Sequence, residues 1–403
     1  MAYRAGRDPL MTLQTLAGKQ IVIGVTGSIA AVETVKLVHA LRRKGARVIP
    51  VMSGAAQGII HPDALTYASG NETITRLTGA VEHVTYCGDG GCADLLLVAP
   101  ATANTIGKIA CGIDDTPVTT FSTTALGSGK PVLIVPAMHH SMYRHPAVRE
   151  NIRTLKKWGV LFVDPVIEEE KAKIAGIDEI VLWCERALLE RPLKDKRVLV
   201  TSGACREPVD SVRVLTTRSS GRMGREIAMQ AFRLGADVTI IHRDILPCVT
   251  NIPVETAGDM REAVHRCFRE TGADYYISAA AISDFAPEQV KGKIPSGKPV
   301  NLVLTPLPKI LLEVIKEYTT KIIAFKIGDK TEKQAKAMLD AGAFMVVTNA
   351  PATMGSDRGD YVCMTHSRRV PVSGTKDEIA AALWDAIIQE STNIAKPRTT
   401  KKQ

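Results

Sequence analysis

Two patterns of apolar residues alternate along the chain. Short apolar runs, often β-branched, are typical of buried strands, and apolar residues at every third or fourth position are typical of amphipathic helices. In the first half the predicted strands are 19–25, 47–52, 94–99, 132–135 and 160–163, with helices at 32–41 and 178–190. Strands that alternate with helices favour a parallel sheet with right-handed crossovers.

The second half repeats this alternation. Strands are predicted at 198–201, 238–242, 275–281, 302–304, 322–325 and 344–347, and helices at 224–234, 259–271, 309–317, 331–339 and 376–390. Pro192 stops the helix before it, so 191–196 is the predicted linker. We therefore predict two doubly wound, mostly parallel α/β domains, 19–190 and 191–392, with a flexible arm at 1–18 and a basic disordered tail at 393–403.

Composition narrows the class of protein. A chain of 403 residues with 45% hydrophobic and 23% charged residues is typical of a soluble protein with more than one core. It has no apolar run of about 18 residues and no apolar signal core near its start, so we expect a cytoplasmic protein that makes no membrane contact. The net charge of +9 includes four cations of the tail, and aromatic residues are only 4%. This disfavours nucleic-acid binding and favours small anionic substrates.

The cysteines and the turns after the strands bear on cofactors. The eight cysteines lack zinc-ligand spacing, so we expect reduced thiols. The turn at 24–28 (GVTGS) offers N–H groups and hydroxyls to a phosphate, and Thr102 and Asn104 follow the strand 94–99 at the same edge of the sheet. The second half opens in a similar way, with Gly203 and the segment 219–224. Neither opening has the G-x-G-x-x-G spacing of a dinucleotide site, which disfavours an NAD-dependent oxidoreductase.

The motifs in their order resemble one family. VTGSIAA, ADLLLVAPATANTIGKIACGIDD and VPAMHHSMY resemble the homo-oligomeric flavin-containing cysteine decarboxylases. TSGACREPVDSVR, TRSSGRMG, SAAAISDF and KGKIPSG resemble phosphopantothenate–cysteine ligases. Together, over about 19–390, they resemble the bifunctional phosphopantothenoylcysteine decarboxylase/phosphopantothenate–cysteine ligases of coenzyme A biosynthesis. The resemblance implies a flavodoxin-like domain followed by a Rossmann-like one.

For the first half, the resemblance implies an FMN-dependent decarboxylase. It implies that His83 is catalytic and that Met138 and His139 bind the substrate. The residues that it implies for FMN binding are Gly27, Ser28, Ser53, Thr102, Asn104 and Thr119. His139 stands where the family has an asparagine that holds the departing carboxylate, and imidazole can donate the same hydrogen bond, so His139 is also expected to act in catalysis. The family's proton-donating cysteine belongs to a short lid, and the corresponding stretch here, DPVIEEEKAKIAG, has no cysteine. The proton donor is therefore unassigned.

For the second half, the resemblance implies a ligase that activates a carboxylate with CTP and Mg²⁺. Lys293 is the catalytic candidate that steadies the triphosphate, Asp284 is the candidate magnesium ligand, and Asp210, Arg213 and Thr217 bind the substrate. The implied CTP contacts are Gly203, Ser220, Gly221, Met223, Ser278, Ala279, Ala280, Asp284, Lys293, Pro308, Lys309, Ile310, Leu311 and Phe325.

This half departs from the family pattern at several positions. Thr217 replaces an asparagine, and Lys309 replaces an aspartate. The two lysines that the family carries on the helix 331–339 and just beyond it fall near Ala337 and Ala341, with Lys336 one residue away.

The expected function is a two-step synthesis. Cysteine is ligated to 4′-phosphopantothenate through an acyl-cytidylate, and the product is decarboxylated to 4′-phosphopantetheine. The expected partners are these substrates and CTP, and a homo-oligomer with a trimeric flavin half and a dimeric ligase half. The alternative is a flavin-binding regulatory protein that has lost decarboxylase activity, because the lid cysteine is missing.

Overall fold

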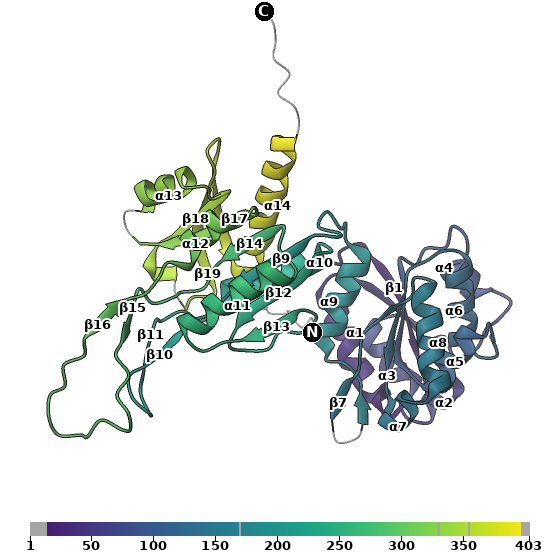
Figure 1. Ribbon diagram of the computed structural model, residues 1–403. Coiled ribbons are helices and arrows are strands. Elements are labelled where there is room, and N and C mark those ends of the chain that lie inside the picture. Colours follow the sequence, from purple (N-terminus) through teal and green to yellow (C-terminus); the bar gives the residue numbers. More distant parts are fainter. Residues whose placement is uncertain (1–13, 169–170, 329–330, 354, 396–403) are drawn as a thin grey trace, which may run out of the picture. The chain divides into compact units, whose positions relative to one another are not determined.

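The computed structural model describes residues 14–168, 171–328, 331–353 and 355–395. The chain folds into two compact units, Met1–Leu189 and Glu190–Gln403 (Figure 1). The predicted arm as far as residue 13 and the predicted tail from residue 396 lie outside the described residues. Within the described ranges, no helix is long and apolar enough to cross a membrane.

A five-stranded parallel sheet forms the centre of the first unit. Its order is β2-β1-β3-β4-β6, with β1 Gln20–Val25, β2 Arg47–Met52, β3 Leu95–Ala101, β4 Val132–Pro136 and β6 Leu161–Phe162. Every residue of β1, β3 and β4 is buried, as expected for a parallel sheet that is covered on both faces. This strand order is that of flavodoxin-like folds, so the predicted fold class of this half is confirmed.

Helices cover both faces of this sheet. Ile21 and Ile23 belong to the core beneath α1 (Thr34–Arg43), α3 (Pro62–Ser69) and α9 (Ile177–Leu188). Val22 belongs to the opposite core, beneath α5 (Ala103–Ala110), α6 (Pro117–Gly127) and α8 (Pro146–Lys157). The shorter helices are η1 (Ile29–Glu33), α2 (Gly54–Gln57), α4 (Glu82–Cys87) and α7 (His140–Tyr143). The carboxyl ends of the buried strands are thus the part of the sheet left for a ligand.

The second unit is built on an eight-stranded sheet. Its order is β13-β12-β9-β14-β17-β18-β19-β20, with β9 Arg197–Thr201, β12 Asp237–His242, β13 Thr250–Pro253, β14 Tyr275–Ser278, β17 Lys321–Ile327, β18 Met345–Asn349, β19 Arg358–Met364 and β20 Arg369–Thr375. The first six strands are parallel in the Rossmann order, and β19 and β20 extend the sheet as an antiparallel hairpin. The Rossmann-like prediction is confirmed.

The helices in the described part of this unit are α10 (Arg222–Arg233), α11 (Ala257–Glu270), α12 (Ile310–Glu317), α13 (Thr331–Asp340), the short η2 (Pro351–Thr353) and α14 (Lys376–Ala395). Buried Trp384 of α14 donates from Nε1 to the Ile227 carbonyl of α10 over 2.9 Å. This bond holds α14, the last helix of the chain, against α10.

Two long hairpins leave the second sheet and run together. One contains β10 (Arg206–Pro208) and β11 (Val214–Thr216), and the other β15 (Phe285–Pro287) and β16 (Leu304–Pro306). We call residues 206–216 and 285–306 the two-hairpin arm; Figure 1 shows it projecting from the sheet. The Val290 N–H donates to the Val209 carbonyl over 3.0 Å, and the Ser211 N–H to Gly292 over 3.1 Å.

The structure corrects several sequence expectations. Residues 14–18, predicted within a flexible arm, form a turn in which Leu16 is wholly buried, because its side chain completes the core around β1. Helix α14 continues to Ala395, into the predicted tail. The expected strand 302–304 lies instead at Leu304–Pro306, within the arm. The hairpin β19–β20 was not expected.

Candidate functional site

The carboxyl ends of β1, β2 and β3 converge in the first unit. The Thr26 hydroxyl donates to the Pro100 carbonyl over 2.7 Å and accepts the Thr102 N–H over 3.1 Å, which ties the turn after β1 to the end of β3. Ser53 follows β2, and its N–H donates to the Val25 carbonyl over 3.1 Å. A Cβ at Gly27 would lie 2.6 Å from the Ala55 Cβ, so no larger side chain fits where these turns meet.

The predicted flavin-binding side chains are used in different ways at this edge. Thr102 and Ser53 cap α5 and α2, each accepting a backbone N–H three residues ahead. Thr119 lies in the first turn of α6 and accepts the N–H of the N-cap residue Thr116 over 2.9 Å. Ser28 does not cap the helix that it precedes, and Asn104 is exposed. The edge therefore offers helix N-termini fixed by their caps together with uncommitted polar side chains, which suits an anionic or polar ligand.

His83 lies on the short helix α4 and is half-buried. Its ring meets that of Phe121 edge-on, with centroids 6.4 Å apart and an interplanar angle of 68°. Its Nδ1 is buried and has no hydrogen-bond partner among the described residues. Phe121 and the predicted flavin contact Thr119 are on the same helix, α6, which therefore links His83 to the strand edge. A buried nitrogen without a partner is available to a ligand.

Met138 and His139 form β5. This strand pairs with a hairpin in the stretch that corresponds to the family's lid. This lid hairpin consists of β7 (Val166–Glu168) and β8 (Lys171–Lys173), and Met138 pairs with Ala172. His139 caps α7: its Nδ1 accepts the Ser141 N–H at 3.4 Å and lies 2.9 Å from the Ser141 hydroxyl. With Nδ1 engaged in this way, Nε2 is the nitrogen left to donate.

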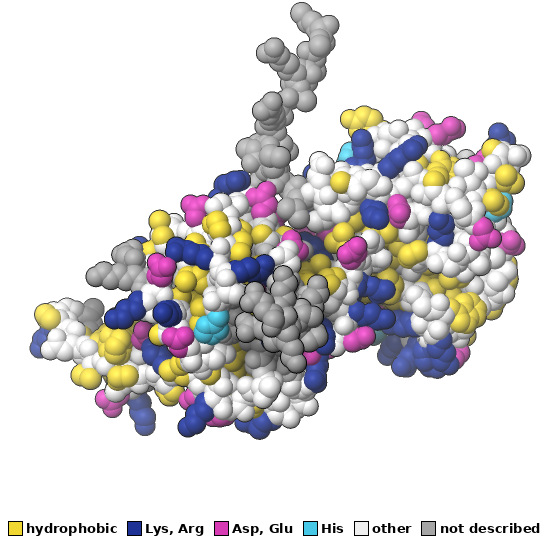
Figure 2. Space-filling model, turned by 90° about the horizontal axis from the view of Figure 1, so that it is seen from above, with side chains coloured by type: hydrophobic (Ala, Val, Ile, Leu, Met, Phe, Trp, Pro, Cys, Tyr) yellow, Lys and Arg dark blue, Asp and Glu magenta, His cyan; other side chains and the backbone are white. Residues whose placement is uncertain are grey.

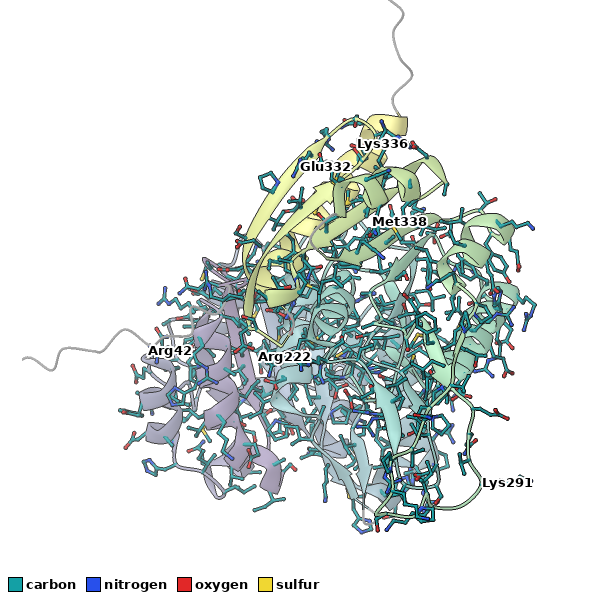
Figure 3. All side chains as sticks on the ribbon, turned by 90° about the vertical axis from the view of Figure 1, so that its left-hand side faces the viewer. Arg42, Arg222, Lys291, Glu332, Lys336 and Met338 are labelled. Carbon is teal, nitrogen blue, oxygen red and sulfur yellow. The ribbon has the colours of Figure 1, made fainter. Side chains whose placement is uncertain are left out.

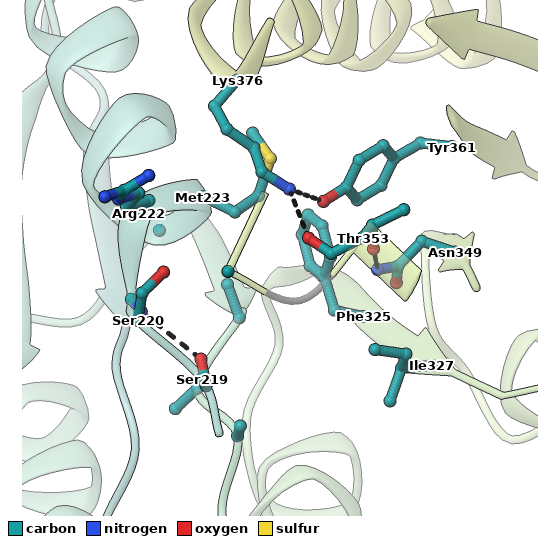
Figure 4. Close-up of a pocket in the computed structure, with 16 residues that line it drawn as sticks. Ser219, Ser220, Arg222, Met223, Phe325, Ile327, Asn349, Thr353, Tyr361 and Lys376 are labelled. Carbon is teal, nitrogen blue, oxygen red and sulfur yellow. Dashed lines mark hydrogen bonds between the residues drawn. The ribbon is translucent and has the colours of Figure 1, made fainter. Parts of the chain in front are cut away.

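The second unit has a pocket between the start of α10 and the sheet (Figure 4). Six of the predicted CTP contacts line it: Ser220, Gly221, Met223, Ala279, Ala280 and Phe325. Gly221 has φ +71°, and a Cβ there would lie 2.9 Å from the Gly203 Cα. A Cβ at Gly224 would lie 2.6 Å from the Ser202 Cβ. Glycine at both positions lets the N-terminus of α10 pack directly on the turn after β9.

The charge of this pocket is one-sided. The lining side chains include Arg222 and Lys376 but no aspartate or glutamate among the described residues. Arg222 forms an ion pair with Asp357, which does not itself line the pocket. The pocket therefore favours an anionic ligand.

A second, arginine-rich pocket shares the wall Ser219–Gly221 and contains the predicted residues Gly203 and Thr217. Its cations are Arg206, Arg225 and Arg243, and its acid is Asp244. Thr217 donates to the Ala281 carbonyl over 3.3 Å, so it lies at the border of the two pockets. His242 lines this pocket too, and burial lowers its pKa.

We call the pocket of Figure 4 the nucleotide pocket, because six of the residues expected to contact CTP line it. Other predicted residues lie outside it. Lys293 is exposed on the loop of the two-hairpin arm, whose neighbouring Lys291 is labelled in Figure 3. Asp284 forms an ion pair with Lys309, which precedes α12. Pro308, Ile310, Leu311 and Ser278 line neither of the two pockets. The described residues contain no group of three His, Cys, Asp or Glu side chains that could hold a metal ion.

Asp210 and Arg213 organise the arm beside Lys293. They form an ion pair at 2.8 Å, and the Asp210 carboxylate also accepts the Ile294 N–H over 3.0 Å. This backbone bond, those from Val212 and Arg213 and the guanidinium lower the pKa of Asp210 to about 2. Asp210 thus anchors the residue that follows Lys293.

Comparison with known proteins gives the family. Residues 10–188 match the family described as Flavoprotein, and 193–391 match that described as DNA/pantothenate metabolism flavoprotein C-terminal domain. The coenzyme A biosynthesis bifunctional protein CoaBC of Thermococcus kodakarensis is 46% identical over 389 residues, 92% of this chain and 95% of that protein. The chain belongs to the CoaBC family. The CoaBC protein of Methanocaldococcus jannaschii is 34% identical, over 92% of this chain and 94% of its own.

Membership of the CoaBC family confirms the predicted bifunctional enzyme of coenzyme A biosynthesis, with a decarboxylase half and a ligase half. Among solved structures, the C-terminal domain of a CoaBC protein is 28% identical, with a TM-score of 0.44 over 51% of this chain and 100% of that one. The FMN-dependent cysteine decarboxylase SpaF is also 28% identical, with a TM-score of 0.38 over 43% of this chain and 99% of that one.

Sequence reasoning missed the lining residues that the last part of this CoaBC-family chain supplies to the nucleotide pocket: Asn349, Thr353, Gly355, Tyr361 and Lys376. They lie at or after the end of β18, on segments that reach the pocket because β19 pairs with β18. The sequence signal available was Lys376 itself, a cation at the start of a predicted helix, where it opposes the helix dipole.

Proposed function

We propose that this chain ligates cysteine to 4′-phosphopantothenate with CTP in its second unit and decarboxylates the product with FMN in its first. The observation that carries the ligase half is the nucleotide pocket, whose lining has cations and a helix N-terminus but no carboxylate among the described residues. A triphosphate and a substrate carboxylate repel each other, so a ligase needs such a pocket to bring them together.

The ligase reaction has two steps. An oxygen of the phosphopantothenate carboxylate attacks the α-phosphorus of CTP, and pyrophosphate leaves. The cysteine amine then attacks the acyl carbon, the amide forms and CMP leaves. Backbone N–H groups at Gly221–Gly224 would stabilise the charge that develops on the phosphates, and Lys293 would meet the departing pyrophosphate when its loop closes.

The expected magnesium site lacks free ligands among the described residues. Asp284, the expected ligand, is engaged by Lys309, and no cluster of three possible ligands occurs in the described ranges. The residues present do not fit a magnesium ion held by protein side chains alone.

FMN fits the residues of the first unit. The fixed turns after β1, β2 and β3, the close approach at Gly27 and the unpartnered Nδ1 of His83 support a ligand at this edge. FMN supplies reversible two-electron oxidation of the substrate's cysteinyl unit when bound. His83 would take a proton from the substrate, and His139 would donate from Nε2 to its carboxylate.

Homo-oligomers, trimeric through the first unit and dimeric through the second, complete the proposal. The two-hairpin arm exposes Val212 by 67% and Val303 by 72%, and Figure 2 shows hydrophobic side chains at that end of the second unit. Ile29 and Tyr67 are exposed in the first unit by 77% and 83%. Apolar surface of this kind supports association between copies. A cytoplasmic setting is supported by the buried thiols Cys87, Cys184, Cys205, Cys267 and Cys363.

The ligase proposal can be tested on the second unit alone. We expect the fragment 191–403 to fold and to release pyrophosphate from CTP when phosphopantothenate and cysteine are both supplied, because both pockets and the arm belong to this unit. Omitting phosphopantothenate is the control and should abolish the release. A folded fragment, shown by circular dichroism, that releases no pyrophosphate would contradict either the domain boundary or the activity.

A further inference from the structure

Lys376 is a buried cation in the nucleotide pocket. It is the first residue of α14, its residue is only 9% exposed, and its side chain lines the pocket. Figure 4 shows the ammonium pointing toward Tyr361 and Thr353. Its position is fixed from the backbone as well, because the Lys376 N–H donates to the Asp357 carbonyl over 3.1 Å.

The partners of this ammonium are all neutral. It donates to the Tyr361 hydroxyl and to the Thr353 carbonyl, the latter at 3.4 Å, and lies 4.8 Å from the centre of the Tyr361 ring. Across the described ranges, no carboxylate forms an ion pair with Lys376. A buried charge without an opposite charge is costly unless something else supplies one.

The nearby acids are committed elsewhere. Asp357 pairs with Arg222, Asp377 accepts the Thr375 hydroxyl, and Glu378 accepts the Thr375 N–H at 2.7 Å. Lys376 also stands at the N-terminus of α14, where the helix dipole disfavours a cation. Neither an ion pair nor the dipole of α14 therefore stabilises the charge of Lys376.

The surroundings of Lys376 favour an anionic ligand. The N-terminus of α10 lines the same pocket, so one helix N-terminus and the Lys376 ammonium border a space whose described lining has no acid. The helix α13 adds no lysine to this lining: Lys333 and Lys336 are exposed, and Figure 3 shows Lys336 on that helix.

We propose that Lys376 binds the phosphate groups of the nucleotide in this pocket and is the cation that neutralises them from the side of α14. This inference rests on the proposed use of CTP, and goes beyond it by assigning a phosphate-binding residue. Its ammonium would move its hydrogen bonds from Tyr361 and Thr353 to phosphate oxygens, which are stronger acceptors because they carry charge.

The test compares nucleotides on the full chain. Lys376→Met removes the charge and keeps an apolar stem, Lys376→Gln keeps hydrogen-bond donors for Tyr361 and Thr353, and Lys336→Met is the matched exposed control. Isothermal titration calorimetry with CTP, CDP, CMP and cytidine gives the affinities. We expect both Lys376 variants to bind CTP roughly ten- to hundredfold more weakly, the loss expected for a charged hydrogen bond. The loss should shrink as phosphates are removed and vanish for cytidine, while the control stays unchanged.

The thermal midpoint of the ligand-free protein distinguishes the proposal from a structural lysine. We expect Lys376→Met to leave it unchanged or raise it, because an uncompensated charge is removed. Variants that melt lower but bind CTP as the wild type does would make Lys376 a structural residue. Equal losses for cytidine and CTP would mean that it contacts the base or ribose. A wild type that binds no CTP would overturn the proposed function itself, a separate failure from the other two.

Discussion

The variant His83→Asn is expected to lose CO₂ release while it still forms the amide bond at the wild-type rate. His83 has a buried Nδ1 without a partner among the described residues, and its ring is held against Phe121. Asparagine can fill part of this space but cannot exchange a proton near neutral pH, and loss of a general base typically lowers a rate by about 10²–10⁴. Decarboxylation is measured with phosphopantothenoylcysteine, and ligation by pyrophosphate release.

The control for this variant is His61→Asn in the same unit. His61 is exposed and accepts the Asp63 N–H at 3.3 Å as the cap of α3, a role that asparagine can take over. It should decarboxylate normally. If His83→Asn keeps its flavin absorption and also releases CO₂ normally, His83 is not the catalytic base.

The variant Lys293→Gln is expected to slow CTP-dependent pyrophosphate release by about 10²–10³, the usual loss when one preorganised contact to a developing charge is removed. Lys293 is exposed in the structure. The residue after it, Ile294, is held in place because its N–H donates to the Asp210 carboxylate. The flavin spectrum and decarboxylation should not change, since Lys293 belongs to the second unit.

Two exposed lysines of the same loop, Lys291 and Lys298, provide controls. As solvated charges they should matter several-fold less than Lys293. Equal and slight effects of Lys291→Gln and Lys293→Gln would make Lys293 an ordinary surface charge, and the cation for the leaving group would have to be sought in the pocket, where Arg222 and Lys376 lie.

The sheets were predictable from sequence because their strands are apolar at nearly every position. β1, β3 and β4 are buried throughout, and a run such as 94–99 has few other stable environments than a strand covered on both faces. The alternation with helices then predicts parallel pairing. Alternating strand residues such as Ile21 and Val22 do face separate cores.

Elements at the edges were harder to predict. In β19 and β20 only Tyr361, Cys363, Val372 and Gly374 are buried, so the apolar pattern is weak, and their pairing with β18 depends on the rest of the sheet. The helix α4 around His83 has six residues, between Val81 at φ +47° and Gly88, too few for a helical period to be recognised.

The difference between local sequence patterns and long-range pairing also explains which residues of the nucleotide pocket were predicted. Ser220, Gly221 and Met223 are close in sequence and form a recognisable motif, and Ala279 and Ala280 follow a buried strand. Tyr361 and Lys376 reach the pocket through tertiary pairing, which no local pattern specifies.

The most direct test of the two-step reaction is its stoichiometry in the purified full chain. Incubated with 4′-phosphopantothenate, cysteine and limiting CTP, the protein is predicted to yield pyrophosphate and CO₂ in equimolar amounts as 4′-phosphopantetheine forms. Pyrophosphate without CO₂, or no consumption of CTP at all, would contradict the proposal that one chain carries out both steps.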